Sequence, residues 1–327
     1  MLRNALLALA VVFTAVAGGP AIGAEADHLR IGLVKFGSGA WEIATIRSHG
    51  YDRSAGIAID SVDLANPAAG EVALQAGGVD AILADWLWVS RQRNAGQHIT
   101  FIPHTAALGE IMVPSSSPIR ALADLEGKRL GVAGGPLDKS WLLLRAYSRR
   151  KLGYDLADKV TVVFAAPPLL SRELTAGHID AALTFWPFAA RLSVQGFRDL
   201  ESMAEIMKEL GFTRPVPMLG FALSESWIAA HPGAVDKFLS AVRQADTLLE
   251  RSDGEWTSLR GLTAAGDDAT LIALRNRFRD GIVKRWSAGE QADTNRLFDL
   301  MAESGGADLT GGAQAIATGT FWQGSPP

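Results

Sequence analysis

Two short segments of the chain carry residues suited to holding a small molecule. Asp85-Trp86 and Phe185-Trp186 lie one hundred residues apart, and each follows a short apolar run. A tryptophan at a strand end can clamp a flat ligand between aromatic faces, although a packed core is the alternative for both rings. A carboxylate within an apolar run is costly unless it is paired or hydrated. We therefore expect Asp85 and both tryptophans to line a crevice.

This spacing is part of an internal repeat. The sequence LQAGGVDAILADWLW (residues 74–88) returns as LTAGHIDAALTFWPF (174–188), with seven of fifteen positions identical. Each copy reads as a helix that ends at a glycine, Gly77 or Gly177, followed by a strand. Further upstream, RIGLVKFGSGAW from Arg30 matches RLGVAGGPLDKSW from Arg129, with one extra residue in the second copy. Collinear matches of this kind predict two related lobes.

Two glycine-containing loops complete the candidate site, FGSGAW at 36–41 and GGPLDKS at 134–140. In open parallel sheets, ligands bind beyond the carboxyl ends of the strands, where loops and helix N-termini converge. The predicted ligand-binding residues are Phe36, Gly37, Ser38, Gly39, Trp41, Asp85, Trp86, Gly135, Pro136, Asp138, Lys139, Ser140, Phe185 and Trp186. Candidates of second rank are Ala65, Asn66, Ala166, Pro167, His104 and Thr105. Asp80 and Asp180 are expected to stabilise turns instead.

Motifs for catalysis are missing from the sequence. GVAGGPLDKS resembles a phosphate-binding loop, but Asp138 stands before Lys139 where that motif requires glycine. There is no H-E-x-x-H and no G-x-S-x-G, and the six histidines are scattered singly. A zinc site would therefore have to be assembled without a local signature. The chain also has no cysteine, hence no thiol nucleophile or disulfide. We expect no catalytic residue, no metal and no cofactor.

The amino-terminal segment is typical of a secretory signal peptide. Arg3 precedes an apolar run over residues 5–17, which is too short to span a bilayer comfortably, and Ala24-Glu25-Ala26 offers a cleavage site. We predict a signal peptide over residues 1–26, cleaved near Ala24 to Ala26, with a retained anchor as the alternative. The mature chain is then a soluble exported protein.

Length and composition fit two globular domains. The chain has 327 residues, of which 48% are hydrophobic and 20% charged, and its net charge is -4. Its 31 basic and 35 acidic residues are interspersed, so no basic field for nucleic acid is expected.

Strands that alternate with helices predict an α/β fold of two Rossmann-like lobes with parallel-type sheets. Prolines and turn residues indicate two crossovers, which would act as hinges near 113–118 and 215–220. We therefore predict a discontinuous lobe one, residues 27–113 and 216–327, and a continuous lobe two, residues 114–215, with a ligand crevice between them.

Three stretches resemble a known family. ALADLEGKRLGV (121–132), the paired helix-Gly-x-x-Asp-Ala strands and HPGAVDKFLSAV (231–242) are similar to periplasmic solute-binding proteins of ABC importers. The branch takes up nitrate, taurine, alkyl sulfonates and thiamine-precursor pyrimidines. The resemblance implies the type II periplasmic binding protein fold and export to a Gram-negative periplasm. It also implies that a monomer without enzymatic activity delivers a small-molecule ligand to an ABC permease in the inner membrane.

Other functions stay open at this point. One is an enzyme on the same bilobal fold, although the fungal-type pyrimidine synthases use a cysteine-rich segment that this chain lacks. Another is an accessory protein that presents its ligand to a periplasmic enzyme or sensor. The charge of the ligand is also open. Helix N-termini favour an anion, whereas Asp85 and Asp138 compete with Lys139, and no arginine lies in the four loops.

Overall fold

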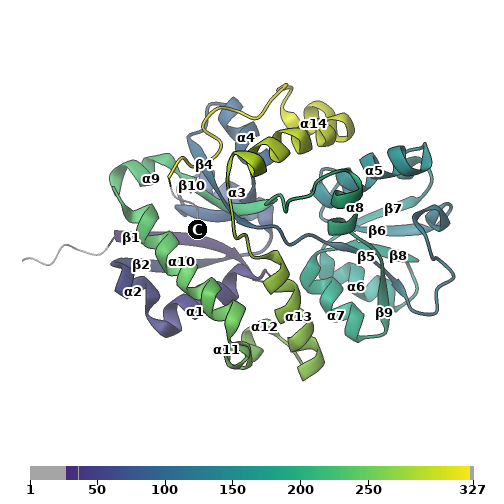
Figure 1. The fold of residues 1–327 in the computed structure, drawn as a ribbon, viewed down its shortest axis with the longest axis horizontal. Helices are drawn as coiled ribbons and strands as arrows, with labels where there is room; N and C mark the ends of the chain where they lie inside the picture. Colours follow the sequence, from purple (N-terminus) through teal and green to yellow (C-terminus); the bar gives the residue numbers. More distant parts are fainter. Residues whose placement is uncertain (1–26, 36, 325–327) are drawn as a thin grey trace, which may run out of the picture.

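The computed structural model describes residues 27–35 and 37–324. They form two lobes, each built on a five-stranded sheet with helices packed against it (Figure 1). The predicted signal peptide, residues 1–26, and Phe36 lie outside the described residues. None of the described helices combines the length and apolarity that crossing a membrane requires.

Sheet one has the strand order β2-β1-β3-β10-β4. Its strands are β1 (Asp27–Val34), β2 (Ile57–Leu64), β3 (Ala81–Asp85), β4 (Ile99–Thr105) and β10 (Leu219–Ser224). The first three run parallel to one another, whereas β10 is antiparallel to both of its neighbours.

Sheet two repeats this arrangement with the order β7-β6-β8-β5-β9. Its strands are β5 (Glu110–Pro114), β6 (Arg129–Ala133), β7 (Thr161–Ala165), β8 (Ala181–Thr184) and β9 (Phe197–Ser202). Here β5 is the antiparallel strand. The two predicted α/β lobes are thus confirmed, with the internal repeat preserved strand by strand.

The sheets are mixed, which corrects the expectation of parallel sheets. Strands β5 and β10 arrive from the opposite lobe, so they enter at the edge where the parallel strands end: Glu110 pairs with Thr184, and Leu219 with Asp85. They must therefore run in the opposite direction. The chain passes from sheet one to sheet two at residues 106–109, before the hinge predicted at 113–118, because Val113 already pairs within sheet two.

Local features of the sequence, such as capping side chains and prolines, mark where several helices of the two lobes begin. They are α1 (Gly39–His49), α2 (Tyr51–Ala55), α3 (Pro67–Gln75), α4 (Trp86–Asn94), α5 (Lys139–Leu152), α6 (Pro167–Thr175), α7 (Trp186–Val194) and α8 (Met203–Glu209). Three of them have helix-start signals in the sequence. Asn66 caps α3 and Asp85 caps α4 through their side chains, and α6 opens on prolines. Ser38, by contrast, makes no capping hydrogen bond to α1.

The same ion pair anchors the start of β3 and of β8. Asp80 accepts hydrogen bonds from the backbone N–H of Arg30 at 2.9 Å and from its guanidinium, which also reaches the carbonyl of Gly77. Asp180 and Arg129 repeat the arrangement in lobe two, again with the preceding glycine carbonyl. The prediction that both aspartates are structural is confirmed.

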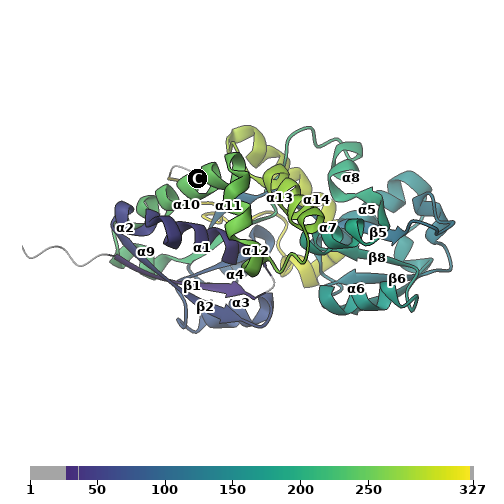
Figure 2. The ribbon, with the colours of Figure 1, turned by 90° about the horizontal axis from the view of Figure 1, so that it is seen from below.

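The carboxyl-terminal helices contact both sheets. They are α9 (Glu225–Ala230), α10 (Ala234–Arg251), α11 (Asp253–Ser258), α12 (Arg260–Thr263), α13 (Asp268–Gly281) and α14 (Ala288–Thr310). Helix α10 covers α1 and α2, whereas α13 packs against α7, and α14 packs against both α4 and α5 (Figures 1 and 2). The assignment of residues 216–327 to lobe one therefore stays a prediction.

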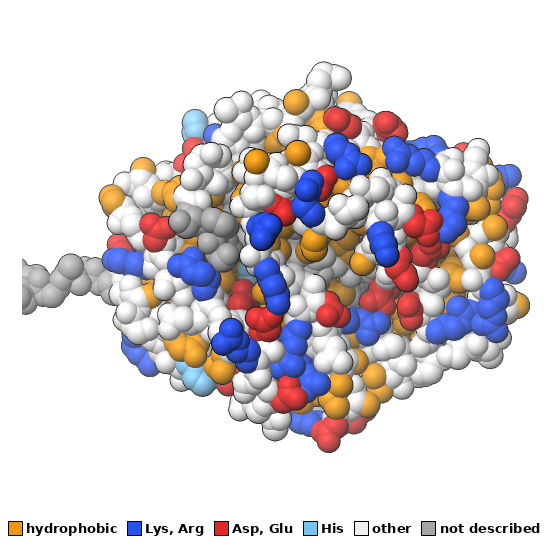
Figure 3. Space-filling model, in the orientation of Figure 1, with side chains coloured by type: hydrophobic (Ala, Val, Ile, Leu, Met, Phe, Trp, Pro, Cys, Tyr) orange, Lys and Arg blue, Asp and Glu red, His pale blue; other side chains and the backbone are white. Residues whose placement is uncertain are grey.

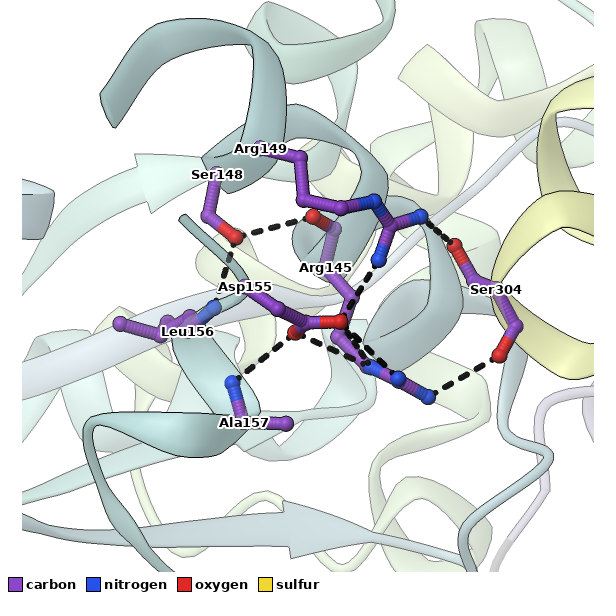
Figure 4. A network of polar contacts seen from close by, with 7 residues as sticks. All are labelled: Arg145, Ser148, Arg149, Asp155, Leu156, Ala157 and Ser304. Atoms are coloured by element: carbon purple, nitrogen blue, oxygen red, sulfur yellow. Dashed lines mark hydrogen bonds and ion pairs between the residues drawn. The ribbon is translucent and has the colours of Figure 1, made fainter. Parts of the chain in front are cut away.

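A polar network fastens α14 to lobe two (Figure 4). The guanidinium of Arg145 donates to Asp155 at 2.9 Å and to the backbone carbonyl of Ser304 at 3.1 Å. Arg149 contacts the same carboxylate and the Ser304 hydroxyl. Any rotation between the lobes must therefore be accommodated where α14 meets α4, or must break this network.

Charges of both signs are interspersed on the face drawn in Figure 3, over both lobes. The view shows no broad field of Lys and Arg side chains on this face.

Candidate functional site

Two of the predicted loops meet across the lobes through an ion pair. Asp85 ends β3, and its Oδ1 accepts a hydrogen bond from the Trp88 backbone N–H at 2.8 Å. Its Oδ2 lies 2.5 Å from Nζ of Lys139, the first residue of α5 in lobe two. Asp138 caps α5 by accepting from the N–H groups of Ser140 and Trp141. Strand ends of the two lobes therefore face each other at this point.

Carboxyl groups outnumber cations around this contact. Burial lowers the pKa of the Lys139 ammonium, but the adjacent Asp85 carboxylate more than offsets this, so the net pKa is raised. Burial raises the pKa of Asp138 to about 6. Burial, followed by the charge of Asp85, raises the pKa of Glu71. Lys139 thus stays protonated among three carboxyl groups, and an anionic ligand would have to compete with them.

The other two loops meet through aromatic rings. Trp186, the first residue of α7, lies edge-on to Trp41 of α1 with ring centroids 5.8 Å apart. From the carboxyl-terminal helices, Trp256 packs against Trp41 and Phe278 packs against Trp186, and the four rings form one buried cluster. Trp186 therefore lies at the boundary between lobes rather than inside lobe two.

Trp86 does not share this position. It is 0% exposed, and its ring lies 6.4 Å from Phe321, near the carboxyl terminus. Its indole N–H has no hydrogen-bond partner among the described residues. In this structure the carboxyl-terminal segment fills the space beside Trp86. Contact between Trp86 and a ligand is a prediction that this packing does not favour.

A family assignment follows from the sequence. The model described as NMT1/THI5 like matches residues 43–249, more than half of the chain. The chain belongs to the NMT1/THI5-like family. No curated protein sequence matches it.

Solved structures share the fold over nearly the whole chain. The alkanesulfonate-binding protein SsuA from Xanthomonas axonopodis pv. citri, bound to MOPS, is 22% identical with a TM-score of 0.71, covering 91% of this chain and 99% of its own. The periplasmic aliphatic sulphonate-binding protein SsuA from Escherichia coli is 20% identical with a TM-score of 0.72, covering 92% and 94%. The desulfurization enzyme DSZB is 17% identical with a TM-score of 0.59, covering 89% and 94%. The bilobal fold expected from the resemblance is thereby confirmed.

The remaining loop residues of this family member frame the same junction. At Gly39 a Cβ would lie 2.4 Å from a Leu83 methyl carbon, so a side chain there would require the Leu83 side chain to move. Ser140 is buried, whereas Gly135 and Phe185 are partly exposed and Pro136 is exposed. Their contact with a ligand stays a prediction.

One contact at the junction has no signal in the sequence. Arg277 of α13 donates two hydrogen bonds of 2.6 Å to Glu110, the first residue of β5. Glu110 pairs with Thr184, directly before Phe185. The two partners are 167 residues apart in the chain, so local pattern could not associate them. This pair joins α13 to the entry of the crossover strand into lobe two.

Lobe two also has an open groove of about 630 Å³, which shares no residue with the four loops. Its walls include Arg120, Lys151 and Glu205. In this structure the four loops are in contact as two pairs, so a ligand between the lobes must separate Trp41 from Trp186 or Asp85 from Lys139.

Proposed function

We propose that this protein is an exported solute-binding protein, which captures a small molecule between its lobes and delivers it to an ABC importer in the inner membrane. Family membership and the bilobal fold support this function. The observation that carries it is the convergence of loops from both lobes at the Asp85–Lys139 and Trp41–Trp186 contacts. A monomer in the periplasm is part of the same proposal.

The chemistry of the junction favours a ligand with a flat or apolar body and a hydrogen-bond donor. Trp41 and Trp186 supply aromatic surface, which stacks on flat or apolar groups. Asp85, Asp138 and Glu71 supply acceptors, while the only ammonium among these contacts, Lys139, is already paired with Asp85. Arginine binds oxyanions such as carboxylate and phosphate in a forked geometry, and no arginine lies in the four loops. We therefore propose that this chain selects a different ligand from the sulfonates named for its structural relatives.

Native mass spectrometry of the protein purified from its own periplasm tests this proposal. We expect one small molecule per chain, released on unfolding and identified by its mass. Calorimetry with that molecule, and with the sulfonates methanesulfonate and taurine, then ranks the affinities. Tight sulfonate binding would contradict the ligand chemistry while leaving the solute-binding role intact.

A turnover assay distinguishes a solute-binding protein from an enzyme on the same fold. The bound molecule, incubated with stoichiometric protein, should be recovered unchanged. Steady formation of a product would replace the binding function with an enzymatic one, as in the bilobal desulfurization enzyme.

A further inference from the structure

Three ligating side chains converge inside lobe one. Glu42 comes from α1, His104 from β4 and Asp246 from α10. One ligating atom from each lies within 4.8 Å of the others, and the His104 Nε2 is 2.9 Å from Oε2 of Glu42. Glu42 is 1% exposed and His104 8%, while Asp246 is partly exposed. The cluster therefore has two enclosed members and one that reaches toward solvent.

These side chains leave polar atoms without partners. Glu42 Oε1, His104 Nδ1 and Asp246 Oδ1 are buried and make no hydrogen bond to described residues. Such atoms are rare in folded proteins because each costs free energy. Burial raises the pKa of Glu42 to about 8, and burial together with the charge of Glu42 raises that of Asp246 to about 8. Burial also lowers the pKa of His104, which keeps its imidazole neutral and able to donate a lone pair to a metal.

We propose that Glu42, His104 and Asp246 bind a divalent transition metal ion, for which zinc is the best match. One imidazole and two carboxylates form a mixed nitrogen and oxygen set that suits zinc better than magnesium or calcium. Zinc bonds of about 2.0 to 2.2 Å place tetrahedral ligand atoms roughly 3.4 Å apart, within the spacing of this cluster. The ion would neutralise both carboxylates.

The ion would join three elements that set the geometry of the crevice. Glu42 follows Trp41, the residue that meets Trp186 across the lobes, and His104 lies near the end of β4, before the crossing at 106–109. Metal binding thereby fixes the amino-terminal turn of α1 against the sheet. This inference stands on lobe one alone and is independent of the proposed function.

Zinc binding to metal-free protein, without a histidine tag, tests the site. After dialysis against a chelator, zinc chloride should bind at one equivalent per chain in calorimetry. At about a hundredfold excess over Kd, zinc should raise the Tm by roughly 3 °C. Cobalt(II) should give visible absorption bands of a low-symmetry site. Glu42→Gln, which keeps the shape and can still hydrogen bond to Asp246, should weaken zinc binding more than about a hundredfold.

A matched control comes from the exposed pair of His178 and Glu173, whose His Nδ1 and carboxylate oxygen are 3.0 Å apart. His178→Gln should leave zinc affinity unchanged, whereas His104→Gln should abolish the single tight site. Circular dichroism checks that every variant is folded. The proposal is overturned if the native chain binds no zinc, or if Glu42→Gln and His104→Gln bind it as the native chain does. A Glu42→Gln variant that melts later than the metal-free protein, while zinc leaves the native Tm unchanged, would identify a proton-sharing carboxyl pair instead.

Discussion

Trp86 and Trp186 occupy the same place in the repeat but different surroundings. Each is the first residue of the helix that follows the third parallel strand of its lobe, α4 after β3 and α7 after β8. Trp86 is fully enclosed beside Phe321, whereas Trp186 meets Trp41 of the other lobe. The repeat thus determines the path of the backbone, while the carboxyl-terminal segment and the opposite lobe decide what each ring contacts.

The preceding residues differ for a related reason. Asp85 caps its helix with a side-chain oxygen and still pairs with Lys139, while Phe185 at the equivalent position makes no side-chain cap. A carboxylate serves both purposes because it has two oxygens with several acceptor sites. At this repeated position lobe one therefore contributes a carboxylate, and lobe two an aromatic ring.

Replacing each of the two tryptophans with alanine gives the largest expected effects and tests whether their surroundings differ. Trp86→Ala should lower the free energy of unfolding by about 3 to 5 kcal/mol, because it leaves a cavity in a closed core. Trp186→Ala should cost less than half as much, because the lobes can approach as the cluster relaxes. It should also weaken ligand binding by about tenfold, or about 1.4 kcal/mol. Denaturant titration and calorimetry measure both. Equal destabilisation with unchanged affinity would make Trp186 a core residue like Trp86.

The ion pairs that anchor the starts of β3 and β8 allow a second comparison between the lobes, with smaller expected effects. The Asp80 side chain is 10% exposed and that of Asp180 is 34% exposed. Asp80→Ala should cost about 1 to 3 kcal/mol, because it leaves the partly buried donors of Arg30 without their acceptor, and Asp180→Ala about 1 kcal/mol or less. Chemical denaturation of the two variants provides the comparison. A larger loss in the Asp180 variant would show that exposure does not control these anchors.

The fold was predictable to the extent that the sequence repeats itself. The glycines Gly77 and Gly177 and the anchors Asp80 and Asp180 recur one hundred residues apart, so two α/β lobes could be inferred. The antiparallel β5 and β10 could not, because their direction depends on where the chain enters the opposite sheet. Arg277–Glu110 and the Glu42 cluster join elements far apart in the chain, and no local pattern signals such contacts.

The smallest expected effect concerns Asp138, whose side chain caps α5. In the matching loop of lobe one, Ser38 makes no side-chain cap. Burial raises its pKa to about 6, so the folded chain binds more protons there than the unfolded chain between about pH 4 and 6. Its contribution to stability is therefore favourable at low pH and is lost as pH rises through about 6. Asp138→Asn, which caps almost as well, should be more stable than the native chain by roughly 1 kcal/mol at pH 8.

The control for this prediction is the same comparison at pH 4. There the advantage of Asp138→Asn should vanish, because the native carboxyl group is then protonated in the folded state. Thermal unfolding across the pH range measures the difference. An advantage that is constant with pH would show that the native Asp138 does not titrate in this window.

The central claim is that a ligand is held between the lobes where the four loops meet. The absence of native cysteines allows a pair of spin labels to be placed at Val72→Cys in α3 and Leu169→Cys in α6, both exposed positions. Pulsed electron paramagnetic resonance then measures the distance between the two labels, one on each lobe, with and without the ligand identified by mass spectrometry. We expect a broad, longer distribution for the ligand-free protein and one narrow, shorter distance at saturation. An identical distribution in both samples would contradict the claim.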